Sequence, residues 1–292
     1  MSPWIEAMRL RTLPVSVAGV LAGTACAIYN HRFALPQMLI CLIFAIVAQI
    51  ASNFANEYYD FKNGLDKKGR EGYRRGVTEG DIRPGAMKRA TYLLLLIDAL
   101  FGCSLIYWGG WWLIAVGVAV AIFAVAYSAG PYPLSHHGLG DVAVVIFFGF
   151  VPVVFTEYVQ AEVLRIDSVT LCTSLAIGLL AANVLIVNNY RDCDDDRAVG
   201  KHTTVVLFGR KTMRTVYLIN GTIAMTCLAM ATTRAPQWTV AGWISIEAMV
   251  LLLWQKICAS TGTALNSMLK FTSILVLVST IYLLVVLSLW PE

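Results

Sequence analysis

Long apolar runs with few charged residues constrain the fold of this chain more than any other feature. Most of the runs are close to the roughly 20 residues that a membrane-spanning helix needs. They lie at residues 12–30, 36–58, 90–108, 111–129, 141–158, 169–189, 212–232, 237–255 and 270–290. Because 58% of the residues are apolar and only 14% are charged, the runs cannot all be buried in a soluble core. We therefore predict an all-α integral membrane protein with about nine transmembrane helices in the lipid bilayer.

Lysine and arginine are distributed unevenly between the two ends of these runs. If the N-terminus lies inside, 19 of the 22 basic residues fall on the inner side, and Arg32, Arg165 and Arg234 fall outside. Basic loops are retained in the cytoplasm, so the sequence predicts a cytoplasmic N-terminus and a C-terminus on the far side. This topology accounts for the net charge of +4, and no nucleic-acid partner is expected.

The cysteines and histidines do not indicate a zinc site. The seven cysteines stand singly, without a C-x-x-C pair, and the four histidines lie at span ends or in loops. Isolated cysteines of this kind are typical small apolar packing residues.

Acidic residues gather in two segments, 53–66 and 188–201, and each segment closes a predicted span on the cytoplasmic side. Residues at multiples of three to four positions share one face of an α-helix. The residues with this spacing are Asn53, Asn56, Glu57 and Asp60 in the first segment and Asn188, Asp192 and Asp196 in the second. Four spans separate the segments, which suggests an internal duplication within a single domain that covers residues 1–292.

Carboxylates at the C-terminal ends of helices are unfavourable, because they oppose the helix dipole and repel one another. A hard divalent cation compensates for both effects, and Mg²⁺ binds a few carboxylate oxygens together with phosphate oxygens. Basic residues follow each segment, namely Lys67, Lys68, Arg70, Arg74 and Arg75 after the first and Arg197, Lys201, Arg210 and Lys211 after the second. The combination predicts Mg²⁺ held against a diphosphate, whereas the basic residues alone are equally consistent with ordinary cytoplasmic loops.

The two segments resemble the signature motifs of the UbiA-type membrane prenyltransferases. The resemblance is carried by NFANEYYDFKNGLD, RRGVTEGDI and VNNYRDCDDDRAVGKHTTVVLFG, with further matches at RLRTLP, Tyr127-Ser128 and GLGDVAVVIFFG. It is closest to the branch that acts on 1,4-dihydroxy-2-naphthoate in menaquinone biosynthesis. Membership would imply a helical bundle around a central cavity in a bacterial cytoplasmic membrane, with the mouth of the active site at the cytoplasmic face. It would also imply Mg²⁺-dependent transfer of a prenyl group from a polyprenyl diphosphate to the naphthoate, with loss of CO₂, giving demethylmenaquinol.

The family motifs assign expected roles to individual residues. The expected metal ligands are Asn56, Glu57, Asp60, Asp66, Asp192 and Asp196, of which Asp60, Asp192 and Asp196 are the expected catalytic residues. The expected diphosphate ligands are Asn53, Lys67, Arg75, Asn188 and Lys201. Arg11, Tyr127 and Asp141 are candidates for contacts with the acceptor or with the carbocation, which a tyrosine ring face can stabilise. Asp141 is equally consistent with a helix cap.

Two features depart from the family pattern. Glu57 stands where aspartate is commoner, which lengthens the ligand by one methylene group. The connection between Tyr127 and Gly140 lacks the lysine or arginine that many members carry there. His136 and His137 could replace that cation, or they could be polar residues of the membrane interface.

The residues alone leave other functions open. Ion-coupled transporters also combine buried acids with internal repeats, but their acids lie near the membrane midplane rather than at one face. Prenyltransferases for other acceptors, such as 4-hydroxybenzoate, homogentisate or haem, are distinguished only by the resemblance. The chain length of the donor does not follow from the sequence.

Overall fold

The computed structural model describes residues 2–69 and 72–290, so Arg70 of the first basic stretch lies outside the described residues. Within them every regular element is helical and no β-strand occurs. The α-helices are α1 (Pro3–Ala7), α2 (Leu13–Tyr29), α3 (Leu35–Lys62), α4 (Gly76–Glu79), α5 (Pro84–Gly109), α6 (Leu113–Ala126), α7 (Gly140–Val144), α8 (Val151–Ala161), α9 (Ser168–Ala198), α10 (Thr204–Ala231), α11 (Thr239–Ala259) and α12 (Leu265–Leu289). The π-helix η3 (Val145–Phe150) joins α7 to α8.

Seven helical segments in the described ranges are long and apolar enough to cross a membrane, which confirms an all-helical, multi-span fold. The count of nine spans is not confirmed, because the runs 111–129 and 212–232 fall on α6 and α10, which do not meet the same criterion. Helix α6 has only 14 residues, and at 1.5 Å per residue it reaches ~21 Å, less than the ~30 Å of a bilayer core. Helix α10 is broken at Gly209 and continues through the basic residues Arg210, Lys211 and Arg214.

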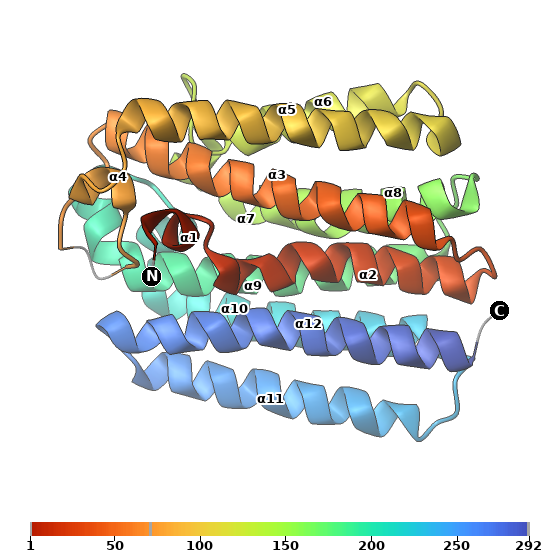
Figure 1. Ribbon diagram of the computed structural model, residues 1–292. Helices are drawn as coiled ribbons and strands as arrows, with labels where there is room; N and C mark the ends of the chain where they lie inside the picture. The colour runs from red at the N-terminus through yellow and green to blue at the C-terminus, as the bar shows by residue number, and fades with distance from the viewer. Residues whose placement is uncertain (1, 70–71, 291–292) are drawn as a thin grey trace.

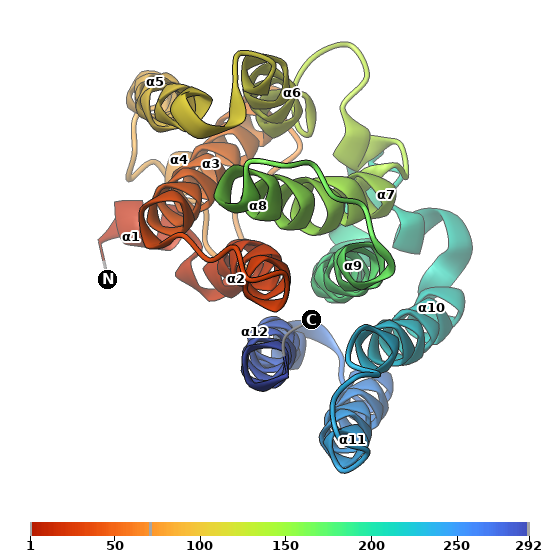
Figure 2. The same ribbon diagram turned by 90° about the vertical axis from the view of Figure 1, so that its right-hand side faces the viewer.

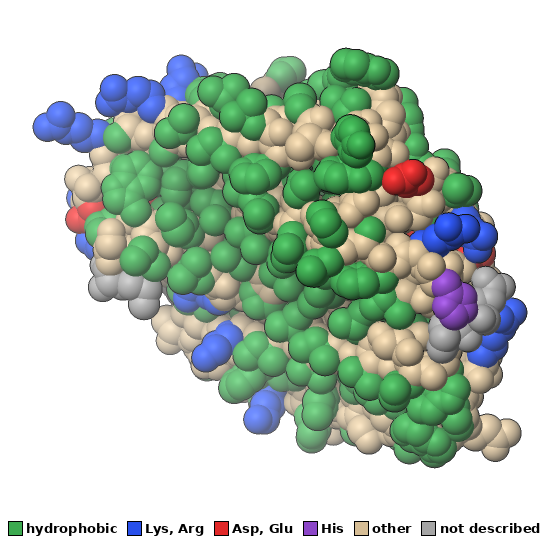
Figure 3. Space-filling view, turned by 45° about the vertical axis from the view of Figure 1, so that its right-hand side comes forward, with side chains coloured by type: hydrophobic (Ala, Val, Ile, Leu, Met, Phe, Trp, Pro, Cys, Tyr) green, Lys and Arg blue, Asp and Glu red, His purple; other side chains and the backbone are tan. Residues whose placement is uncertain are grey.

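Successive long helices run in alternating directions, so the two acidic segments lie at the same end of the bundle (Figure 1). The N-terminus is at this end and the chain ends at the opposite one (Figure 1). Along the bundle axis, α2, α3, α8 and α9 surround the centre, with α5 and α6 on one side and α10, α11 and α12 on the other (Figure 2). Hydrophobic side chains are spread over the whole face shown in Figure 3, and the charged ones lie mainly toward its edges.

Proline residues mark the starts of several of these helices. Proline occupies the first turn of α2, α3 and α5, where its missing N–H group leaves no hydrogen bond unmade. The largest core cluster then packs α9 against α2, α10, α11 and α12.

A pair of glycines brings η3 directly against α9. A Cβ atom on Gly149 would lie 2.4 Å from the carbonyl oxygen of Ser174 and 2.6 Å from the Cα atom of Gly178. Only glycine permits this approach of two backbones. Phe148, on the same turn of η3, is half-buried and lines the cavity that the acidic ends of α3 and α9 also line.

Candidate active site

Helix α3 ends in a glycine turn that reverses the chain directly after its acidic face. Gly64 adopts φ = +69°, a left-handed conformation that favours glycine. The amide of Leu65 donates to the carbonyl oxygen of Asp60 at 2.9 Å, and that of Gly64 donates to Phe61 at 3.0 Å. This pair of bonds is the Schellman motif, and it folds Asp66 back toward the helix end.

Helix α9 ends in the same way. Gly200 adopts φ = +77°, the amide of Lys201 donates to the carbonyl oxygen of Asp196 at 2.9 Å, and that of Gly200 donates to Arg197 at 3.2 Å. When the two glycine turns are aligned, the chain pairs Asn53 with Asn189, Asn56 with Asp192, Asp60 with Asp196 and Gly64 with Gly200. The matching ends favour the predicted duplication.

The two helix ends face a shared polar cavity of about 160 Å³. From the first segment and its loop, the lining residues are Asn53, Asn56, Asp60 and Arg75. From the second segment, they are Asn188, Asn189, Asp192, Asp196 and Lys201. Tyr127 and Arg9 also line the cavity. Residues separated by more than a hundred positions in the sequence are thus brought to one site.

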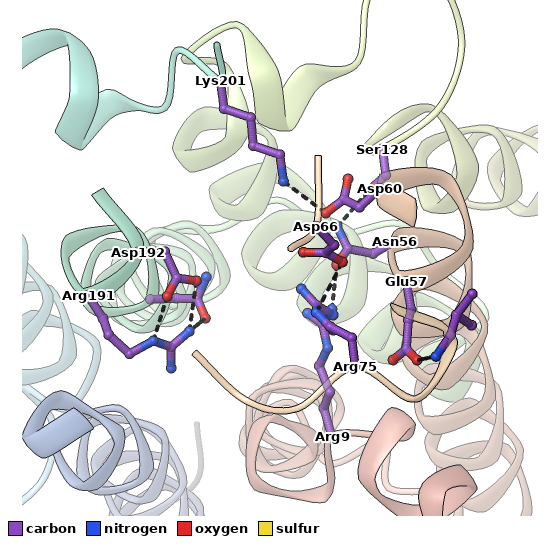
Figure 4. Close-up of polar contacts among 12 residues, drawn as sticks. Arg9, Asn56, Glu57, Asp60, Asp66, Arg75, Ser128, Arg191, Asp192 and Lys201 are labelled. Atoms are coloured by element: carbon purple, nitrogen blue, oxygen red, sulfur yellow. Dashed lines mark hydrogen bonds and ion pairs between the residues drawn. The ribbon is translucent and has the colours of Figure 1, made fainter. Parts of the chain in front are cut away.

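Asp60 is the most enclosed acid of this cavity, with 1% of its surface exposed. Lys201 Nζ donates to its Oδ2 atom at 2.9 Å, a contact that joins the two acidic segments (Figure 4). His136 Nε2 lies 3.5 Å from Oδ1. Among the described residues, Oδ1 accepts no hydrogen bond, so this buried oxygen is available to a bound group.

The Lys201 ammonium group is held between carboxylates of both segments. Burial lowers the pKa of Lys201, but the charges of Asp60 and Asp196 outweigh burial and raise the pKa above its ordinary value. The group is therefore a permanent cation at neutral pH, as a diphosphate-binding role requires.

Asp192 on the other side of the cavity is held by its neighbour Arg191. The guanidinium group donates from Nε to Oδ1 at 2.7 Å and from Nη2 to Oδ2 at 2.8 Å, a bidentate pair (Figure 4). Arg191 also donates to the side-chain oxygens of Asn188 at 2.9 Å and of Asn266, at the start of α12, at 2.8 Å. Arg191 and Asp192 are each 3% exposed.

Five of the predicted site residues do not line the polar cavity. Asp66 is buried behind Arg75, whose Nε atom lies 3.5 Å from its carboxylate. Glu57 points to α4, where it accepts a hydrogen bond from Val77 N at 3.0 Å (Figure 4). Lys67 is exposed in the loop.

The other two are Arg11 and Asp141. The guanidinium group of Arg11 stacks on the ring of Tyr73. Asp141 accepts a 2.6 Å hydrogen bond from Thr204 Oγ1 and so ties the start of α7 to the start of α10.

Three residues at the site were not assigned to it from the sequence. Arg9 donates to Asn56 Oδ1, and its only signal was its position within RLRTLP. Arg191 lies inside the second motif but was not separated from the other basic residues there. His136 was interpreted either as a replacement for the missing cation of the site or as a polar residue of the membrane interface. The structure favours the first interpretation, since its ring faces Asp60.

The donor set suits a metal that is shared with a ligand. The described residues contain no group of three or more His, Cys, Asp or Glu side chains that could hold a metal ion by itself. Carboxylate and amide oxygens from both segments nevertheless line one cavity, and within the described part of the chain Asp60 Oδ1 and Arg75 Nη1 are buried without hydrogen bonds. Mg²⁺ binds in this manner, through one or two carboxylates plus substrate phosphate oxygens and water.

A second, apolar cavity of about 280 Å³ continues from the polar one into the membrane region. It runs between α2, α3, α5, α6 and α8. The two cavities share Gln49, Ser52, Phe123 and Phe148 in their walls. The ring of Phe123 stacks on Phe147 with centroids 3.8 Å apart, which fixes this part of the wall.

Fold and site together define a multi-span membrane protein in which acidic and basic side chains converge on a cavity at one end of the helical bundle. A model of the UbiA prenyltransferase family matches residues 16–275. The chain belongs to this family.

Curated relatives and solved structures agree with this assignment. 1,4-Dihydroxy-2-naphthoate octaprenyltransferase of Escherichia coli is 36% identical over 263 residues, which cover 86% of this chain and 83% of the relative. The protein of the same name from Haemophilus influenzae is 34% identical over 262 residues, covering 85% and 82%. The structure of a UbiA homolog from Archaeoglobus fulgidus bound to GPP and Mg²⁺ has a TM-score of 0.68 at 16% identity and covers 98% of this chain and 100% of that chain. The last comparison confirms the predicted fold.

Proposed function

We propose that the chain transfers a polyprenyl group from its diphosphate to 1,4-dihydroxy-2-naphthoate, with decarboxylation, giving demethylmenaquinol. The observation that carries the proposal is the polar cavity in which Asp60, Asp192 and Lys201 converge and which opens into an apolar cavity. A ligand with an anionic head and a hydrocarbon tail is complementary to this pair of cavities. The names of the curated relatives support the naphthoate as acceptor and an octaprenyl donor.

The basic residues of the site are placed to bind the leaving diphosphate. Arg75 and Lys201 line the cavity from opposite segments, and Arg9 lines it from the N-terminal stretch. Their fixed positive charges stabilise the negative charge that develops on the diphosphate as the carbon–oxygen bond breaks. His136 Nε2, 3.5 Å from Asp60 Oδ1, adds a further polar group beside this acid.

The acids and amides supply the ligands for a divalent metal. The solved relative bound to GPP and Mg²⁺ supports Mg²⁺ as the ion. Asn56, Asp60, Asp192 and Asp196 would hold it, since their side chains line the cavity from both segments. When bound, the metal neutralises the diphosphate and so makes it a better leaving group.

The bond changes place the prenyl group on the ring in exchange for the carboxylate. The bond between the first prenyl carbon and the diphosphate breaks, and its electron pair leaves with the diphosphate. A ring carbon supplies the electrons of the new carbon–carbon bond, and the bond to the carboxylate breaks to release CO₂ and restore the aromatic ring. Tyr127 and Phe123 line the cavity wall, and their ring faces can stabilise the allylic cation and keep water away.

The proposal is tested with purified protein in detergent. Incubation with 1,4-dihydroxy-2-naphthoate, octaprenyl diphosphate and Mg²⁺ is expected to yield prenylated product and CO₂ in equal amounts. Chelation of the metal should abolish both. The same assay with 4-hydroxybenzoate and homogentisate is expected to give no product. Turnover of either of these acceptors in place of the naphthoate would contradict the acceptor assignment.

We also propose that the chain lies in a bacterial cytoplasmic membrane, with its N-terminus and the polar cavity on the cytoplasmic side. The uneven distribution of basic residues supports this orientation. In a cysteine-free background, Lys68→Cys and His202→Cys are expected to react with an impermeant thiol reagent only from the cytoplasmic side, because both positions are exposed at the end with the acidic segments. Thr233→Cys, exposed after α10, should react only from outside. Labelling with the opposite sidedness would overturn the orientation.

A further inference from the structure

We infer that Glu57 is a positioning residue, which fixes the loop carrying Arg75 through a hydrogen bond to the backbone of Val77, and that it is not a metal ligand. The inference rests on the proposed function, since it assigns Arg75 to the diphosphate. The carboxylate is 1% exposed and does not line the polar cavity. Its Oε1 atom accepts a hydrogen bond from Val77 N at 3.0 Å, and the carboxylate points away from Asp60 (Figure 4).

The second segment supports this interpretation independently. Aligning the two glycine turns pairs each cavity-lining residue of α3 with a cavity-lining residue of α9, for example Asn56 with Asp192 and Asp60 with Asp196. The residue that pairs with Glu57 is Cys193, which is 1% exposed and packs in the apolar core. Neither Glu57 nor Cys193 lines the cavity. This register therefore faces the surrounding protein in both halves, and an acid there serves a local contact.

The hydrogen bond of Glu57 holds a backbone segment that is next to a cavity-lining residue. Val77 belongs to the short helix α4, which begins directly after Arg75. Arg75 in turn lies 3.5 Å from Asp66, so the contact between Glu57 and α4 also positions this ion pair. Gly76 packs so closely against Ile82 that a Cβ atom would lie 2.9 Å from Ile82 Cδ1. Val77 and Ile82 are themselves buried in a satellite core, so the hydrogen bond from Val77 to Glu57 lies beside an apolar contact.

Length and charge of the side chain separate the two roles. A hydrogen bond to Val77 N needs an acceptor oxygen at the reach of a glutamate, and glutamine provides one. Aspartate is one methylene shorter and cannot reach the amide without movement of α3 or α4. If Glu57 were a metal ligand, Glu57→Asp would be the milder change and Glu57→Gln the more damaging one. Aspartate keeps the charge and is the commoner residue of the family, whereas glutamine loses the charge.

The test compares Glu57→Gln and Glu57→Asp by two measurements on the detergent-purified full chain. The first is the affinity for inorganic diphosphate in the presence of Mg²⁺, measured by calorimetry. We expect Glu57→Gln to stay within about threefold of the wild type and Glu57→Asp to bind at least about tenfold more weakly, the cost of an unmade buried hydrogen bond. The Mg²⁺ concentration at half-maximal binding should not change in Glu57→Gln.

The second measurement is amide hydrogen exchange of the peptide that contains Val77. Exchange should be faster in Glu57→Asp and unchanged in Glu57→Gln, because only the shorter side chain leaves the amide unbonded. Glu79→Asp, the same substitution on α4, is the matched control and should change neither measurement. Weak binding in Glu57→Gln with a raised Mg²⁺ midpoint, or unchanged exchange in Glu57→Asp, would overturn the inference. If the wild type binds no Mg²⁺-diphosphate, that result contradicts the proposed function. The hydrogen-exchange measurement still tests the role of Glu57 in that case.

Discussion

Replacement of Asp60 or Asp192 with asparagine is expected to reduce kcat to less than about a tenth of the wild-type value at saturating Mg²⁺. Each change preserves the shape of the side chain and removes one negative charge from the wall of the polar cavity. In the proposed function this charge holds the metal, so its loss should cost several kcal/mol of transition-state stabilisation. A loss of ~1.4 kcal/mol already lowers the rate tenfold. Initial rates over a Mg²⁺ titration measure the effect.

Asp194 provides the matched control for this experiment. It lies two residues from Asp192 in the same acidic run, but its side chain is 70% exposed and pairs with Arg197 and Arg210 outside the cavity. Asp194→Asn should therefore retain nearly full activity, because exposed ion pairs contribute little. An Asp60→Asn or Asp192→Asn enzyme that keeps more than about a tenth of wild-type kcat would refute the assignment of that residue.

Replacement of Arg191 with methionine is expected to lower the free energy of unfolding by about 3–5 kcal/mol. Methionine fills a similar volume but leaves the buried carboxylate of Asp192 without its bidentate partner. It also removes the donors to Asn188 and Asn266, and with them the polar link between α9 and α12. Denaturant unfolding in mixed micelles measures the loss.

The double variant Arg191→Met/Asp192→Asn separates charge from packing. It removes both members of the buried pair, so it should recover much of the lost stability while remaining inactive. Arg74→Met is the control, because Arg74 pairs with Asp81 at 2.6 Å in an exposed position and should cost less than about 1 kcal/mol. An Arg191→Met protein as stable as the wild type would show that the bidentate pair does not stabilise the fold.

The apolar runs predicted the helices well, because hydrophobic length is a property of the local sequence. The predicted run 36–58 became α3, and 169–189 became α9, each extended by the polar residues of its motif. The count of spans could not be fixed in this way. Whether the 14 residues of α6 cross a bilayer depends on the neighbouring helices and on lipid deformation, which hydropathy alone does not contain.

Residues of the site were predictable where helix periodicity determines the direction in which a side chain points, and they were not predictable elsewhere. Asn53 and Asp60 lie seven residues apart and share a face, and both line the cavity. Asn56 and Glu57 each complete that spacing equally well, yet they are about 100° apart around the helix, and only Asn56 lines the cavity. The contacts of Arg191 and His136 depend on how separate helices approach one another. The internal duplication stays a prediction, favoured by the two matching glycine turns.

The wall shared by the polar and apolar cavities has a consequence for how this chain meets its substrates. Gln49, Ser52, Phe123 and Phe148 stand where one cavity passes into the other, so a bound donor would have its head on the aqueous side and its tail on the lipid side of these residues. The concentration that governs saturation is then the mole fraction of donor in the surrounding lipid or detergent. Adding empty micelles at constant total donor should raise the apparent KM for the donor in proportion to the detergent, while the KM for a water-soluble acceptor stays fixed. Such a dependence would show that the two substrates reach one site from two different solvents.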